Sequence, residues 1–228
     1  SDANNKGDVF VRDLQTGQTF LVSVSSAGVQ ADQGANTADI SDDGRYVAFA
    51  SDATDLIPND ANGLRDLFYW DSFDRSTRRI STNFNSGEAD MSGDGRYVVY
   101  RSDASDLVPG DTNGRSDVFI WDLANGSTTR LTNGNSDSWG PSISDDGRYI
   151  VFTSGASDLV AGDTNGVSDI FVWDRLGSTS RLVAANGSAT ISANGGSIAF
   201  SSYGMASLPG GVTSRQNVYR WDRSTLTV

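Results

Sequence analysis

One long segment occurs four times in this 228-residue chain, and a repeat of this size limits the fold more than any single residue does. The first copy begins at Asp42 as DDGRYVAFASDATDLIPNDANGLRDLFYWD, and two close copies begin at Gly93 and Asp145. A more divergent fourth copy begins at Ala193. The turn glycines of successive copies are 51, 52 and 48 residues apart, at Gly44, Gly95, Gly147 and Gly195. Each copy is therefore expected to form the same structural unit.

Each copy contains four short stretches that are typical of β-strands, in the same order. The first precedes an Asp-Asp-Gly-Arg turn, as in residues 38–41, and the fourth follows a further turn, as in residues 129–132. The second and third are apolar at almost every position, as in residues 46–50 and 67–70. Strands with this pattern are buried on both faces. We therefore expect each sheet to lie between two others.

A β-propeller meets this requirement, because neighbouring blades cover both faces of each sheet. The sequence predicts an all-β chain in which residues 36–82, 88–132, 139–183 and 187–228 form four-stranded antiparallel blades. Residues 1–30 repeat only the third and fourth strands, which predicts a half blade without inner strands. The chain is then one domain of about four and a half blades, and part of a larger propeller. Alternatively, a second molecule supplies the missing strands, which predicts self-association through the half blade.

Composition excludes several classes of function. The formal charge of −12 and the pI near 4.2 disfavour nucleic acids and anionic membrane surfaces as partners. Histidine and cysteine do not occur, and Lys6 and Glu88 are the single lysine and glutamate. The commonest general base and thiolate chemistry are therefore missing. No apolar run is long enough to cross a membrane, so we expect neither catalysis by this segment nor membrane insertion.

The long loop between the second and third strands carries the motif D-x-N-G-x-x-D. Carboxylate and amide oxygens around such a turn can supply part of the shell of about six to eight oxygens that calcium takes. Asp and Asn before Gly are also ordinary turn formers that hydrogen-bond their own backbone, and this interpretation stays open beside the first. The motif predicts calcium sites on one rim of the propeller. The residues are Asp60, Asn62 and Asp66; Asp111, Asn113 and Asp117; Asp163, Asn165 and Asp169; and Asp2, Asn4 and Asp8 in the half blade.

Five tryptophans divide into a repeated set and a single exception. The repeated set occupies one equivalent position of the third strand and is expected to pack between blades; it consists of Trp70, Trp121, Trp173 and Trp221. Trp139 differs, because it precedes Gly140 and Pro141 in what reads as a connection between two blades. It is expected either to contact a ligand such as a sugar or to cover the core.

The repeated motifs resemble those of a known family. S-x-D-G-R-Y-[VI]-[AV]-F, A-S-D-L-V-P-G-D-T-N-G and S-D-[VI]-F-[VI]-W-D resemble the TolB-like β-propeller repeats, which are relatives of WD repeats. The resemblance covers essentially the whole chain and implies one blade per copy and a binding or scaffolding role. It implies no reaction, since members range from accessory modules to domains of enzymes. It also implies a periplasmic, cell-surface or secreted bacterial location.

These features together predict a non-catalytic propeller module with calcium-binding loops, which interacts with protein or carbohydrate outside the cytoplasm. Two alternatives stay open. The chain could be part of a propeller hydrolase or lyase whose catalytic residues lie outside this segment, or it could be a structural assembly unit.

Overall fold

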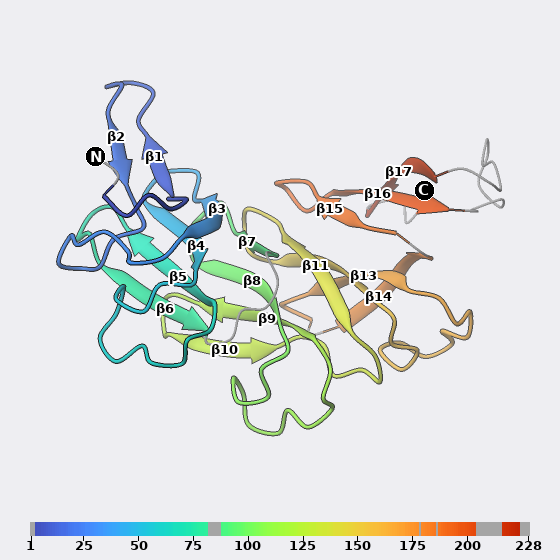
Figure 1. Ribbon diagram of the computed structural model, residues 1–228. Helices are drawn as coiled ribbons and strands as arrows, with labels where there is room; N and C mark the ends of the chain where they lie inside the picture. Colours follow the sequence, from blue (N-terminus) through green and yellow to red (C-terminus); the bar gives the residue numbers. More distant parts are fainter. Residues whose placement is uncertain (1–2, 82–87, 178, 186, 204–215, 224–228) are drawn as a thin grey trace.

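The computed structural model of the chain describes residues 3–81, 88–177, 179–185, 187–203 and 216–223, which form seventeen β-strands and no helix. Accordingly, these residues contain no helix that could span a membrane. The strands form five antiparallel sheets arranged side by side, with the first and last sheets at opposite ends of the array (Figure 1). The all-β propeller architecture predicted from the repeats is confirmed.

Each sheet is built from consecutive strands. The half blade pairs β1 (Phe10–Arg12) with β2 (Thr19–Leu21). The first blade contains β3 (Ala35–Ile40), β4 (Tyr46–Ser51), β5 (Asp66–Asp71) and β6 (Thr77–Ser81), and the second contains β7 (Ala89–Met91), β8 (Tyr97–Ser102), β9 (Asp117–Asp122) and β10 (Ser127–Arg130). The third contains β11 (Ser138–Ile143), β12 (Tyr149–Ser154), β13 (Asp169–Asp174) and β14 (Thr179–Ala185). The fourth contains β15 (Ala189–Ile191), β16 (Ser197–Tyr203) and β17 (Gln216–Asp222).

The core lies between the sheets, because the second and third strands send alternate side chains to the two neighbours. In β8, Val98 and Tyr100 pack against the first blade, whereas Tyr97 and Val99 pack against the third. All four side chains are buried. This arrangement explains why the two central strands of each copy are apolar at almost every position.

In each of the first three blades, a tyrosine at the start of the second strand packs against the turn of the next blade. Tyr97 of β8 lies against Gly147, and a Cβ atom at Gly147 would collide with its ring. Tyr46 and Gly95 make the same contact one blade earlier, as do Tyr149 and Gly195 one blade later. Gly147 also has a φ of +66°, so this turn requires glycine both for its backbone and for the packing of the preceding blade.

The innermost strands are linked around the axis by side chains that accept backbone hydrogen bonds from the following blade. Asp39 Oδ2 in β3 accepts from the Met91 amide at 2.7 Å, and Asp90 Oδ2 in β7 accepts from the Ile143 amide at 2.8 Å. In the third blade, Ser142 Oγ of β11 takes the place of these carboxylates and accepts from the Ile191 amide of the fourth blade at 3.5 Å. Burial raises the pKa of Asp90 to about 6, and the neighbouring Asp39 acts in the same direction.

Candidate functional site

Three long loops occupy one rim of the propeller, where each connects the second strand of a blade to the third (Figure 1). Residues 52–65, 103–116 and 155–168 form them, and each leads directly into Asp66, Asp117 or Asp169 as the first residue of β5, β9 or β13. The motif glycines have positive φ angles of 63°, 64° and 70°, at Gly63, Gly114 and Gly166. The loops therefore begin and end at equivalent places and turn in the same way.

The motif asparagine has the same double role in each loop. Asn113 Oδ1 accepts a hydrogen bond from the Arg115 amide at 2.9 Å, which closes an Asx-turn. Its Nδ2 donates to Asp117 Oδ2 at 2.9 Å. Asn62 and Asn165 make the corresponding bonds in the other two loops. The turn-forming role considered from the sequence is therefore present in all three loops, and each asparagine directs its amide nitrogen toward the last aspartate.

An arginine from the outer strand lies against both carboxylates in the first loop. Arg79 Nη1 of β6 is 3.2 Å from Asp60 Oδ1 and 3.1 Å from Asp66 Oδ2. Asp66 is fully buried, and Asp60 is 6% exposed. Burial raises the pKa of Asp60, as does the charge of Asp66, whereas Arg79 acts in the opposite direction. The arginine thus supplies the positive charge that two buried carboxylates require.

The second loop repeats this arrangement and adds a hydroxyl group. Arg130 Nη1 of β10 is 2.6 Å from Asp111 Oδ1 and 3.6 Å from Asp117 Oδ2. Thr132 donates its hydroxyl hydrogen to Asp117 Oδ1 at 2.7 Å. Burial raises the pKa of Asp117, while the bonds from Thr132 and Asn113 lower it. Asp117 therefore has three partners although it is fully buried.

In the third loop, none of the described arginine side chains forms an ion pair with the two carboxylates, and Leu182 stands where the first two blades have Arg79 and Arg130. Asp169 is fully buried and Asp163 is 8% exposed. Asn165 Nδ2 lies 3.0 Å from both oxygens of Asp169, and Asp163 Oδ1 has no hydrogen-bond partner among the described residues. Burial raises the pKa of Asp169, and the charge of Asp163 raises it further.

In the half blade, Asp8 has different hydrogen-bond partners from the equivalent aspartates. Asp8 Oδ1 accepts from the Ser23 hydroxyl and Asp8 Oδ2 from Gln30 Nε2, both at 2.7 Å. Asn4 Oδ1 accepts from the Lys6 amide, so the Asx-turn is retained. Asp2 lies outside the described residues. Within the described part of the chain, no three acidic side chains come together in an arrangement suited to a metal ion, so each loop offers at most two carboxylates and an amide.

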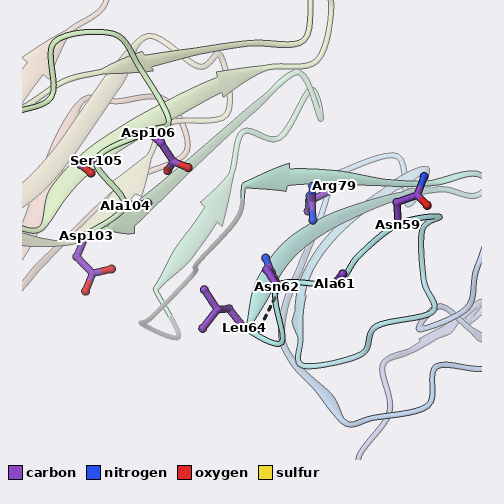
Figure 2. A pocket seen from close by; sticks show the side chains of 9 residues that line it. All are labelled: Asn59, Ala61, Asn62, Leu64, Arg79, Asp103, Ala104, Ser105 and Asp106. Carbon is purple, nitrogen blue, oxygen red and sulfur yellow. Dashed lines mark hydrogen bonds between the residues drawn. The ribbon is translucent and has the colours of Figure 1, made fainter.

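A polar cleft of about 620 Å³ separates the long loop of the first blade from residues 103–106 of the second (Figure 2). One side is formed by Asn59, Ala61, Asn62, Leu64 and Arg79, and the other by Asp103, Ala104, Ser105 and Asp106. Leu64 is 45% exposed, so an apolar surface accompanies the polar groups.

The expected position of Trp139 in a connection between blades is wrong. Trp139 lies in the innermost strand β11, where it pairs with Thr153 and is half-buried. The strand continues through Gly140 and Pro141 because Gly140, with a φ of +61°, accommodates a shift in register between Trp139 and Ser142. The repeated tryptophans pack between blades as expected: Trp70, Trp121 and Trp221 are buried, and Trp173 is partly buried.

Sequence reasoning missed the two loop arginines, although a signal was present. Arg79 and Arg130 each follow the phenylalanine of their third strand, Phe68 or Phe119, by eleven residues. It also missed the ion pairs between the Asp-Asp-Gly-Arg turn and the Asp after tryptophan, such as Arg45 with Asp71 at 2.8 Å. Aligning the copies and comparing all charged positions, rather than each motif separately, could have shown that these arginines and aspartates recur together.

No family model matches the chain, and no curated protein matches it, but solved structures do. TolB from Acinetobacter baumannii superposes with a TM-score of 0.60 and 17% identity, covering 96% of this chain and 47% of TolB. The chain has a TolB-like β-propeller fold. The tricorn protease gives a TM-score of 0.62 with 14% identity, over 95% of the chain and 23% of the protease. The propeller domain of the Trilobed protease from Pyrococcus furiosus gives a TM-score of 0.59 with 14% identity. The match covers 95% of this chain and 61% of that domain's chain.

The chain thus spans about half the length of TolB and about a quarter of the tricorn protease. At these identities the comparisons show the fold and not an activity. Prolyl endopeptidases and an oligogalacturonate lyase also match this fold, so the structural neighbours of the chain include enzymes.

Proposed function

We propose that this chain is a non-catalytic binding module, which interacts with protein or carbohydrate outside the cytoplasm through the rim of long loops. The observation that carries the proposal is the cleft between the first and second blades (Figure 2). Its walls combine carboxylates, amides and an arginine with the exposed side chain of Leu64. Concave sites with a few polar groups and an apolar surface are suited to sugars and peptides.

The ionised groups of the rim and of the opposite turns support a binding role over catalysis. Asp60 and Asp66 share Arg79, and Asp71 forms a two-point ion pair with Arg45. A general base needs a carboxylate that can reach the substrate and change its protonation state. These carboxylates are instead held by arginines that recur at equivalent places, in the loops of the first two blades and in the turns of the first three. Recurrence of this kind is the pattern of scaffold interactions.

Calcium in the long loops is the second part of the proposal. The loops bring two carboxylates together, but an arginine already lies beside them in the first and second blades. In the third blade, leucine stands at the position of these arginines, at Leu182. A periplasmic, cell-surface or secreted location suits this proposal, because calcium sites of extracellular modules are filled at about millimolar concentrations.

The test is an array of glycans and peptides probed with the immobilised chain, followed by affinity measurements on matched variants. Leu64→Asp places a charge in the cleft and is expected to weaken binding at least about tenfold, or about 1.4 kcal/mol. Val167→Asp changes the equivalent exposed position of the third loop and should leave binding unchanged. Both positions are exposed, so stability should change by no more than about 0.5 kcal/mol. Equal affinities for the two variants would place the binding surface elsewhere.

An enzyme-associated role is an alternative, since peptidases and a lyase match this fold in addition to TolB. Activity of the full-length protein on peptides or oligogalacturonates, sensitive to Leu64→Asp, would support it. A structural assembly unit is the third possibility. Mass measurement in solution tests it, because a strict monomer at all concentrations would contradict self-association through the half blade.

A further inference from the structure

Two substitutions in the outer strand distinguish the third blade from the first two. The register places Arg79 opposite Phe68 and Arg130 opposite Phe119. In the third blade Leu182 takes this position, opposite Phe171. A second exchange lies two residues further along, where Ala184 replaces the hydroxyl residues Ser81 and Thr132. At these two positions the third blade therefore lacks the positive charge and the hydroxyl donor that the second blade supplies to its loop.

The third loop retains both aspartates although Leu182 and Ala184 replace the arginine and the threonine of the second blade. Asp163 and Asp169 are buried to the same degree as Asp111 and Asp117. Asp169 receives bonds from Asn165 alone among the hydrogen bonds of the described side chains, and Asp163 Oδ1 receives none. Two buried carboxylates without a cation are costly, because burial penalises each charge and the charges repel each other. A positive charge at this place would remove both costs.

We propose that the third loop binds one divalent cation of the calcium type between Asp163 and Asp169, where the first two loops hold an arginine. The unpartnered Asp163 Oδ1 and the oxygens of Asp169 are the ionised ligands. Calcium suits this set better than magnesium, since it accepts irregular shells completed by carbonyl oxygens and water, whereas magnesium requires near-octahedral geometry. This deepens the calcium part of the proposed function and assigns it to a single loop.

The substitutions define an exchange experiment between the second and third loops. Equilibrium dialysis with radioactive calcium counts the ions bound to the purified chain, and we expect one per molecule. Leu182→Arg rebuilds the arginine of the second blade and is expected to lower calcium affinity at least about a hundredfold. Asp163→Asn removes one charge with little change in shape and should have a similar effect. Asp111→Asn, the matched change in the second loop, should leave calcium binding unchanged.

The reverse exchange tests the same idea by gain of binding. Arg130→Leu, alone or with Thr132→Ala, converts the second loop to the composition of the third and is expected to add a second bound calcium. If Arg130→Leu unfolds without calcium, the second ion is measured as calcium-dependent recovery of its thermal transition. In the unmodified chain, calcium at a hundred times its Kd should raise the Tm by about 5–10 °C relative to chelator.

Three results would overturn the proposal: no bound calcium in the unmodified chain, undiminished binding by Leu182→Arg, or equal Tm values with calcium and chelator. In the last case, a Tm that rises on acidification and loses this dependence in Asp163→Asn would show that the carboxylates share a proton instead. The ligand affinity measured with Leu64→Asp is a separate readout. Loss of the calcium result therefore leaves the rim-binding proposal intact, and loss of ligand binding leaves the calcium site intact.

Discussion

Equivalent strand positions have opposite surroundings inside the array and at its two ends. Phe68, Phe119 and Phe171 are completely buried, whereas Phe10, at the same position of the half blade, is 53% exposed. At the other end Val218 is 79% exposed, although Leu67, Val118 and Ile170 occupy its position in the other blades and are completely buried. The end sheets are antiparallel like the others, although they contain two and three described strands instead of four. Burial in this fold is therefore provided by the neighbouring blade and not by the sheet to which a residue belongs.

The largest expected effect comes from truncating one aromatic ring in each environment. Phe171→Ala should lower the free energy of unfolding by about 3–5 kcal/mol, because it opens a cavity between the second and third blades. Phe10→Ala at the exposed face should cost no more than about 0.5 kcal/mol. Urea unfolding of the two variants measures both values. Similar losses would mean that the face carrying Phe10 is covered in solution.

Adding a methyl group to two turn glycines sharpens the comparison. Gly44 and Gly147 have nearly the same φ, +70° and +66°, so alanine costs about 1 kcal/mol in backbone strain at either place. A Cβ at Gly147 would also collide with Tyr97, whereas no atom of the described residues lies within 4 Å of one at Gly44. Gly147→Ala should therefore lower the free energy of unfolding by a further amount of about 1–3 kcal/mol. Thermal melts separate the variants, and equal shifts would show that the tyrosine moves aside without cost.

The smallest effect is a pH dependence at the inner edge of the second blade. Because its folded pKa of about 6 lies above the unfolded value of about 3.9, Asp90 binds protons more readily in the folded chain. The full shift corresponds to about 3 kcal/mol, and because Asp90 is only partly buried its charge is screened by solvent. Stability should therefore fall by on the order of 1–2 kcal/mol as pH rises between these values. Asp90→Asn keeps an oxygen for the Ile143 amide and removes this loss. Tm values from pH 4 to 7.5 test it, with Asp13→Asn on the exposed half-blade turn as control; an unchanged slope would assign the dependence to other groups.

The fold could be predicted because the same pattern of apolar residues occurs at equivalent positions in several copies of the repeat. Tyr97 to Tyr100 are apolar in succession, and only a sheet covered on both faces explains such a strand. The loop geometry was predictable as far as Asn113 and Gly114, since Asx-turns and positive φ depend on local sequence.

The partners of the loop carboxylates could not be read from the loop motif. Arg130 reaches Asp111 only because β10 pairs with β9 in one register, and register is a property of two strands. Trp139 was misplaced for a related reason. A Gly-Pro pair usually ends a strand, but here the shift in register at Gly140 lets β11 continue through it.

The side chains that link the innermost strands have a consequence for anything entering along the propeller axis. Edge strands usually recruit extended polypeptides through unpaired amide groups. Here the amides of Met91 and Ile143 already donate to Asp39 and Asp90 of the preceding blade. A peptide threaded through the centre must therefore be held by its own side chains, since adding it as a further strand would first break the bonds that join one blade to the next.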